Sequence, residues 1–142
     1  MKLYVDTCVY LDLINYNNNY SFEDYSQEVY EFFNIVMDLD FKVIFSRWVK
    51  EELERKLKEK QIDNSIFDDL FDNLDIIDLN YDEKQKAEAE RLSPNNWQDQ
   101  LHVILAKKAN ALMIVTQNIR DFKEFCKGIE YMNTRTFIRK YS

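Results

Sequence analysis

Four acidic side chains stand where predicted helices and strands begin or end: Asp6, Glu52, Asp99 and Asp121. A carboxylate at such a place is costly unless a cation or a hydrogen-bond donor faces it. Oxygen ligands favour hard divalent ions such as Mg²⁺ or Mn²⁺, and no Cys/His pair has the spacing of a zinc site. Metal held by carboxylates can activate water and stabilise the leaving oxygen of a phosphodiester. The four acids therefore predict metal-dependent phosphodiester hydrolysis.

The apolar pattern predicts strands that alternate with helices. Strands are expected at residues 2–6, 41–45, 75–79, 112–116 and 129–132. Helices are expected around residues 25–37, at 47–61, 82–92, 97–110 and 121–127, and from Thr134, with a short helix from Asn64 or Ser65. This alternation is typical of βαβ units, so we expect an α/β fold with a central parallel sheet and helices on both faces. Residues 1–142 are expected to form a single domain.

The predicted sheet would bring the four acids to one edge. In open parallel sheets, sites form beyond the carboxyl ends of the strands, where the strand order reverses. Asp6 follows the first strand, and Asp121 lies beyond the strand 112–116. Asp99 opens a helix and can point back towards the same edge, and the helix of Glu52 begins where a strand ends. Carboxylates gathered in this way repel one another without a cation, which again indicates a metal site.

The composition limits the classes of partner. The chain has a formal net charge of −7, which argues against sequence-independent coating of nucleic acid and against a duplex-holding flap nuclease. Cys8 and Cys126 are far apart and form no CxxC pattern, so two reduced thiols in a cytoplasmic protein are expected. No apolar run approaches the roughly 20 residues of a membrane span, so no membrane association is expected.

Some local features carry expectations of their own. Thr7 is expected to cap a turn after the first strand, and residues 15–20 are rich in turn-forming Asn and predict a loop. Ser21 with Asp24 resembles a capping box, and Gly128 is expected at the end of the helix 121–127. These features concern the ends of elements rather than the predicted site.

Four stretches, taken in order, resemble the PIN-domain family: LYVDTCVYLDL, SRWVKEEL, DQLHVILAKKANALMIVTQN and IRDF. This family includes the ribonuclease toxins of VapBC toxin–antitoxin pairs. The resemblance covers essentially the whole chain and implies a three-layer sandwich with an Mg²⁺- or Mn²⁺-dependent site that cuts single-stranded RNA. It matches Asp6 to the acid after the first strand, Glu52 to the helix acid, and Asp99 to the acid that opens the LHVILA helix.

The fourth acid departs from the family pattern. Many members carry an acid two residues after the strand-ending Thr, and this chain has Asn118 there. Asp121 would then supply the charge, directly or through water, with Thr116 and Asn118 as hydrogen-bonding supports. Asn118 also keeps open an alternative in which the fold is a binding or scaffold module without catalytic turnover.

Other roles remain open at this point. Glu51 is the alternative to Glu52, and His102 is expected to be a hydrogen-bonded core residue rather than a ligand. Arg120 and Lys123 could hold RNA phosphates, although solubility explains basic surface residues equally well. If the protein is a toxin, the resemblance implies a small antitoxin that masks the site, and exposed aromatic residues would suit that contact and a homodimer.

Overall fold

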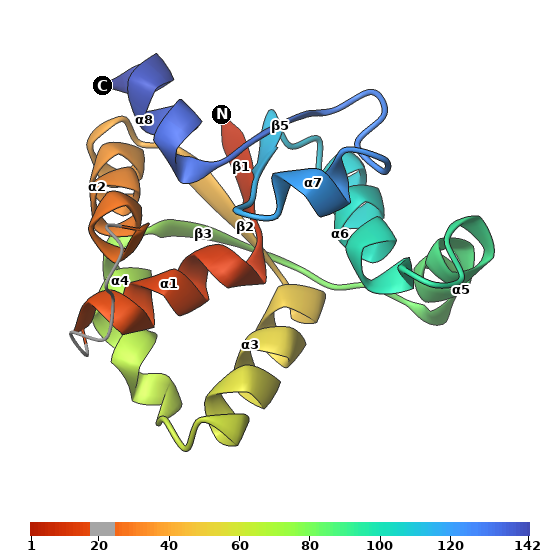
Figure 1. Ribbon diagram of the computed structural model, residues 1–142, viewed down its shortest axis with the longest axis horizontal. Coiled ribbons are helices and arrows are strands. Elements are labelled where there is room, and N and C mark those ends of the chain that lie inside the picture. The colour runs from red at the N-terminus through yellow and green to blue at the C-terminus, as the bar shows by residue number, and fades with distance from the viewer. Residues whose placement is uncertain (18–24) are drawn as a thin grey trace.

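The computed structural model describes residues 1–17 and 25–142. Its centre is a sheet of five parallel strands in the order β3-β2-β1-β4-β5 (Figure 1). The strands are β1 (Lys2–Val5), β2 (Lys42–Ser46), β3 (Asp75–Leu79), β4 (Met113–Val115) and β5 (Glu130–Met132). The protein is therefore an α/β fold with an all-parallel sheet.

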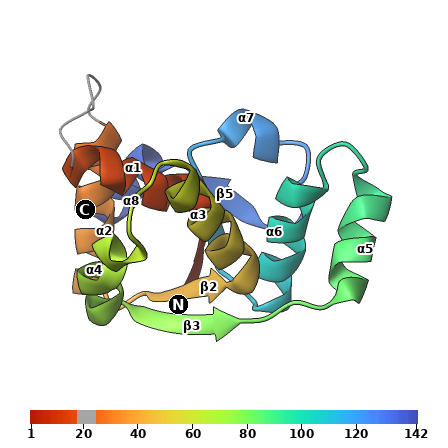
Figure 2. The same cartoon turned by 90° about the horizontal axis from the view of Figure 1, so that it is seen from below.

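Helices connect the strands and cover both faces of the sheet. They are α1 (Thr7–Asn17), α2 (Tyr25–Asp38), α3 (Arg47–Glu59), η1 (Asn64–Phe67, a 3₁₀ helix), α4 (Asp68–Asn73), α5 (Glu83–Leu92), α6 (Trp97–Lys108), α7 (Ile119–Phe122) and α8 (Thr134–Tyr141). Helices α2, α4 and α8 lie on one side of the strands, and α5 and α6 lie on the other (Figures 1 and 2). The result is the expected three-layer sandwich.

Burial explains why the middle strands are apolar on both faces. Leu3, Tyr4 and Val5 of β1 are all fully buried, as are Met113, Ile114 and Val115 of β4. Strands covered by helices on both sides lack the polar alternation of a half-exposed sheet and read as short continuous apolar runs. The two apolar runs that were expected to precede Asp6 and Asp121 are therefore central strands of the sheet.

The strand order reverses at β1. One neighbour, β2, leads on to β3, whereas the other neighbour, β4, leads on to β5. Leu3 is in register with both Val43 and Met113, and the backbone N–H of Asp6 donates to the carbonyl of Val115 at 2.9 Å. Residues that follow β1, β2 and β4 therefore gather at one edge, which is where a parallel sheet places its sites.

The strands and most helices agree with the sequence predictions to within a few residues, but the chain after Asp6 does not. It enters helix α1 directly instead of making a capped turn. The helix continues to Asn17, so the loop expected to start at Asn15 is wrong for its first three residues. The buried set Val9, Tyr10, Leu13 and Ile14 has helical spacing, and this signal was outweighed by the Asn-rich composition. The rest of that loop and the Ser21–Asp24 capping box lie outside the described residues.

A second difference concerns the helix expected at 121–127. Helix α7 starts earlier, at Ile119, and ends at Phe122, whose fully buried ring holds this single turn against the core. Gly128 therefore caps no helix; its positive φ of 82° turns the chain before β5. Among the described residues, no helix is both long enough and apolar enough to cross a membrane.

Candidate metal centre

Asp6 is a nearly buried carboxylate at the exit of β1. Its side chain is held by three donors: Oδ1 accepts from the backbone N–H of Thr7 at 2.8 Å, and Oδ2 accepts from Oγ1 of Thr116 at 2.8 Å and from Sγ of Cys8 at 3.1 Å. A buried charge needs such donors or a cation to offset the loss of water. The fold thus fixes this carboxylate with donors from the start of α1 and from the residue that follows β4.

Glu52 reaches the same place from α3. This helix begins where β2 ends, because the side chain of Ser46 caps it by accepting from the N–H of Val49 at 3.1 Å. Glu52 lies on the second turn, and its Oε1 accepts from Oγ1 of Thr7 at 2.8 Å and lies 2.6 Å from Nε2 of His102. Burial opposes ionisation of Glu52, but the hydrogen bond and charge of His102 outweigh it and lower the pKa of this carboxyl.

Glu51, the alternative to Glu52, belongs to a different contact. Its Oε1 accepts from Nε of Arg47 at 3.0 Å and from the hydroxyl of Tyr81 at 2.9 Å. The guanidinium of Arg47 lies 4.0 Å from the centre of the Tyr81 ring. Of the two neighbouring glutamates, the structure therefore brings Glu52 to Asp6 and engages Glu51 elsewhere.

His102 is the residue that the sequence interpretation underrated. It is buried and has a partner on each ring nitrogen, as expected of a core histidine, but those partners lead into the site. Nδ1 lies 2.7 Å from the hydroxyl of Tyr4, and Nε2 lies 2.6 Å from Glu52 and 3.5 Å from Oδ1 of Asp6. Its place one helical turn after Asp99 was the available signal.

The charges around His102 set its protonation. Burial alone would lower the pKa of the imidazole, but the hydrogen bond to Glu52 and the negative charges of Asp6, Glu52 and Asp99 raise it. A cationic or strongly polarised imidazole is thus stabilised between two carboxylates. In the protein without a metal ion, His102 therefore faces the carboxylates of Asp6 and Glu52.

The donor set fits a divalent cation. One ligand atom from each of Asp6, Glu52 and His102 can be chosen so that all three lie within 4.8 Å of one another. Two carboxylates and an imidazole suit Mg²⁺ less closely than oxygen ligands alone and are compatible with Mn²⁺. These three residues could hold a metal ion.

Asp99 faces this group from the first turn of α6. Its side chain is half-buried, and burial together with the charge of Asp6 raises its pKa to about 6, with Asp121 and Glu52 adding to the effect and His102 opposing it. Asp99 is not one of the three residues whose ligand atoms lie within 4.8 Å of one another. It therefore lies within electrostatic reach of the centre but further out than Asp6 and Glu52.

Of the remaining predicted residues, Thr116 is buried and the others are exposed at the rim of the candidate site. Asp121 is exposed on α7 and shares a small hollow with Arg120. Thr116 is buried and bonded to Asp6, whereas Asn118 contributes through its backbone N–H, which donates to Oγ1 of Thr116 at 3.0 Å. Lys123, like Arg120, is exposed. Thr116 thus contacts Asp6 directly, and Arg120 lines the same hollow as Asp121.

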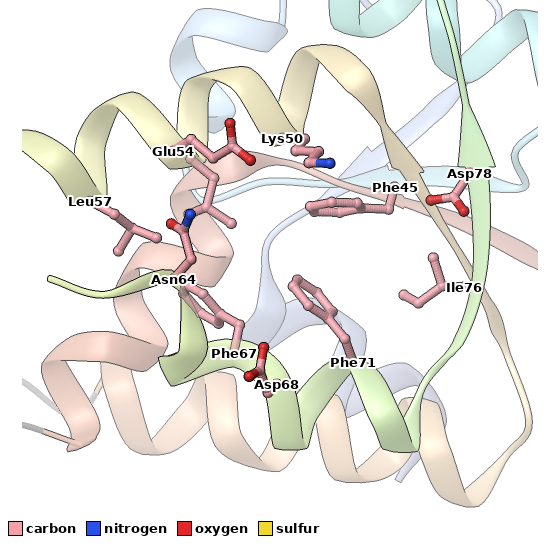
Figure 3. Close-up of a pocket in the computed structure, with 11 residues that line it drawn as sticks. Phe45, Lys50, Glu54, Leu57, Asn64, Phe67, Asp68, Phe71, Ile76 and Asp78 are labelled. Carbon is pink, nitrogen blue, oxygen red and sulfur yellow. The ribbon is translucent and has the colours of Figure 1, made fainter.

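A larger hollow lies elsewhere, between α3, α4 and β3 (Figure 3). Three phenylalanines point into it, Phe45, Phe67 and Phe71, with Lys50 and Asp78 at its side. None of the four predicted acids lines it. The candidate chemistry therefore belongs to the polar edge of the sheet rather than to this apolar hollow.

Comparison with known proteins supports the fold. No family model and no curated protein matches the sequence. A chain of the crystal structure of VapBC2 from Rickettsia felis, bound to a DNA fragment from their promoter, is similar with a TM-score of 0.67. The two chains are 22% identical, over 94% of this chain and 98% of that chain. At this identity the likeness shows a shared fold.

Proposed function

We propose that this protein is a cytoplasmic, divalent-metal-dependent endoribonuclease that cuts single-stranded RNA. Asp6, Glu52 and Asp99 would hold the ion, Mg²⁺ or Mn²⁺, and Asp121 would assist directly or through water. The observation that carries the proposal is the meeting of Asp6 and Glu52, which come from different elements and lie within 4.8 Å of each other at the switch point of the sheet. The fold shared with VapBC2 adds support.

The protein's own residues would supply orientation and charge. Thr116 and Thr7 hold the carboxylates of Asp6 and Glu52, each through a hydrogen bond of 2.8 Å. Arg120 and Lys123 would contact RNA phosphates from the rim. A bound divalent ion would supply activation of water and compensation for the charge that develops on the phosphate.

The substrate would be a single strand because the charge of the protein disfavours a duplex. A formal net charge of −7 disfavours binding of a double helix, which needs an extended basic face. A few basic residues beside a metal site can still guide a flexible strand. An endonuclease that acts on single-stranded RNA segments is consistent with the negative net charge and with these few basic residues.

A protein partner is part of the proposal. The similar structure is a complex of VapBC2, and we propose that this chain likewise has a small antitoxin partner. A basic side chain of that partner would pair with the acids and mask the site. We also expect a homodimer, and light scattering that shows only monomers at micromolar concentrations would contradict it.

Substitution of the acids tests the proposed activity. Asp6→Asn and Glu52→Gln should abolish cleavage of a fluorescent RNA in the presence of Mn²⁺, because each removes a negative ligand. The matched control is Glu51→Gln, one residue away on α3 but bonded to Arg47 and Tyr81, which should retain activity. Asp6→Asn should melt at the same temperature as the unsubstituted protein or higher, since repulsion between acids is relieved. Cleavage by Asp6→Asn at the unsubstituted rate would refute the assignment.

A binding module without turnover is the second candidate. It is favoured by the position of Asn118, which is exposed and brings an amide where an acid is expected. Calorimetric titration with Mn²⁺ combined with cleavage assays on several RNAs separates the two functions. Uptake of metal without any cleavage would favour the module.

A further inference from the structure

A chain of buried hydrogen bonds runs from the start of α3 to Glu52. The N–H of Val49 donates to Oγ of Ser46 at 3.1 Å, and this hydroxyl lies 2.8 Å from that of Tyr4. The hydroxyl of Tyr4 lies 2.7 Å from Nδ1 of His102, and Nε2 lies 2.6 Å from Oε1 of Glu52. Ser46, Tyr4 and His102 are each at most 1% exposed. Water therefore competes little for these contacts.

When the imidazole of His102 is neutral, the chemistry of the two ends fixes the direction of these bonds. An ionised carboxylate can only accept, so Nε2 of His102 must carry the hydrogen that it shares with Glu52. In the neutral imidazole the other nitrogen, Nδ1, is then the acceptor, and Tyr4 must donate to it. Ser46 accepts from Val49 and donates to Tyr4. In this arrangement every donor hydrogen has an acceptor.

We propose that His102 is a positioning residue of the metal site and not one of its ligands. It would donate from Nε2 to Oε1 of Glu52 and so hold this carboxylate beside Asp6, while Tyr4 fixes the tautomer and the ring. Neither ring nitrogen is then free to bind a metal ion. Nε2 carries a hydrogen, and the lone pair of Nδ1 accepts from the hydroxyl of Tyr4. The inference rests on the proposed function, because it assigns a role within that site.

The first test reads the tautomer directly by nitrogen-15 NMR of the full chain. His102 is the only histidine, so one pair of ring nitrogens gives the whole signal. At a pH at which the imidazole is neutral, we expect the proton on Nε2, both without metal and in excess Mg²⁺. A proton on Nδ1, or loss of the Nε2 proton when Mg²⁺ is added, would overturn the proposal.

The second test compares variants by their affinity for Mn²⁺ in calorimetry. Loss of a group that orients a ligand typically weakens metal binding about 10- to 100-fold, and we expect this of His102→Leu. His102→Gln can accept from Tyr4 and donate to Glu52 through its amide, and it should restore most of the affinity. Equal affinity of His102→Leu and the unsubstituted protein, or a Gln variant as weak as the Leu variant, would overturn the proposal.

Tyrosine-to-phenylalanine substitutions give a milder test with a matched control. Tyr4→Phe removes only the hydroxyl that holds Nδ1, and we expect metal affinity to fall several-fold. Tyr10 is equally buried, and its hydroxyl finds no hydrogen-bond partner among the described residues. Tyr10→Phe should therefore leave metal affinity unchanged and not lower the melting temperature. Equal effects of the two substitutions would overturn the proposal even if the His102 variants fail to fold.

The outcomes distinguish this inference from the proposed function. If the unsubstituted protein neither binds Mn²⁺ nor cleaves RNA, the proposed function fails, and the NMR measurement without metal still decides whether Nε2 of His102 carries the proton. If the protein binds Mn²⁺ and cleaves RNA but the Nε2 proton is absent, the inference alone fails.

Discussion

Thr116 donates a hydrogen bond of 2.8 Å to Oδ2 of Asp6 across a sequence separation of 110 residues. The contact follows from the sheet, because β1 and β4 are parallel neighbours and both side chains come directly after their strands. Thr116 is itself held by the backbone N–H of Asn118 at 3.0 Å. The end of β4 thus positions the acid at the end of β1.

Replacement of Thr116 should weaken the metal site while preserving the fold. Thr116→Val keeps the shape of this fully buried side chain and removes the donor to Asp6. Loss of such an orienting group typically costs about 10-fold or more in metal affinity. Thr116→Ser keeps the hydroxyl and should bind Mn²⁺ much as the unsubstituted protein does, as measured by calorimetry. Equal affinities of the Val and Ser variants would contradict the role of Thr116.

Asp99 should make the metal-free protein less stable as the pH rises. Burial and the charge of Asp6 raise its pKa to about 6 in the folded state, above the ordinary value of 3.8 expected for the unfolded chain. The folded state therefore favours the protonated form, and this stabilisation is complete below about pH 4. It is lost as the pH rises through about 6.

Thermal melting of Asp99→Asn between pH 4 and 8 checks this dependence. The variant should gain stability over the unsubstituted protein as the pH rises, by on the order of 1 kcal/mol at pH 7 once the partial exposure of Asp99 is discounted. Asp72→Asn, which changes an exposed acid on α4, should show no such gain. If the difference in stability between Asp99→Asn and the unsubstituted protein stays constant over this pH range, the negative charge of Asp6 does not affect the ionisation of Asp99.

Arg120 should contribute to binding of RNA more than to its cleavage. It is exposed beside Asp121 on α7, where a phosphate could reach it. Arg120→Ala should raise KM with little change in kcat, and it should lower the salt dependence of RNA binding by about 0.7 in the log–log slope. Arg139→Ala, on α8, is the matched control and should change neither quantity. A lower kcat with unchanged KM would assign Arg120 a different role.

The pattern of apolar runs was enough to predict the parallel sheet and the edge at which Asp6 and Glu52 meet. Asp6 could be placed at this edge from the sequence because it ends a short apolar strand, and parallel strands end on one side. Glu52 could be preferred but not separated from Glu51, since both lie on the same turn of a charged helix. Only the rotation of α3, set by its buried face of Trp48, Val49, Leu53 and Leu57, decides between them.

His102 could not be assigned from sequence for a related reason. A histidine on a mostly apolar helix face is typical of a core residue, and burial is indeed what the structure shows. Its partners Tyr4 and Glu52 come from β1 and α3, which are distant in sequence. The residues around His102 in the sequence therefore do not indicate these contacts. The last turn of α1 was missed because Asn15 and Asn17 favour a loop by composition, although Val9, Tyr10, Leu13 and Ile14 have helical spacing.

The most direct measurement is anomalous diffraction from a crystal soaked in Mn²⁺. The account predicts an anomalous peak beside the carboxylates of Asp6 and Glu52 at the exit of β1, and loss of this peak in Asp6→Asn. A structure with no peak there, or with Mn²⁺ only at another acidic position such as Asp12 and Glu28, would contradict the central claim that these separated acids form one metal site.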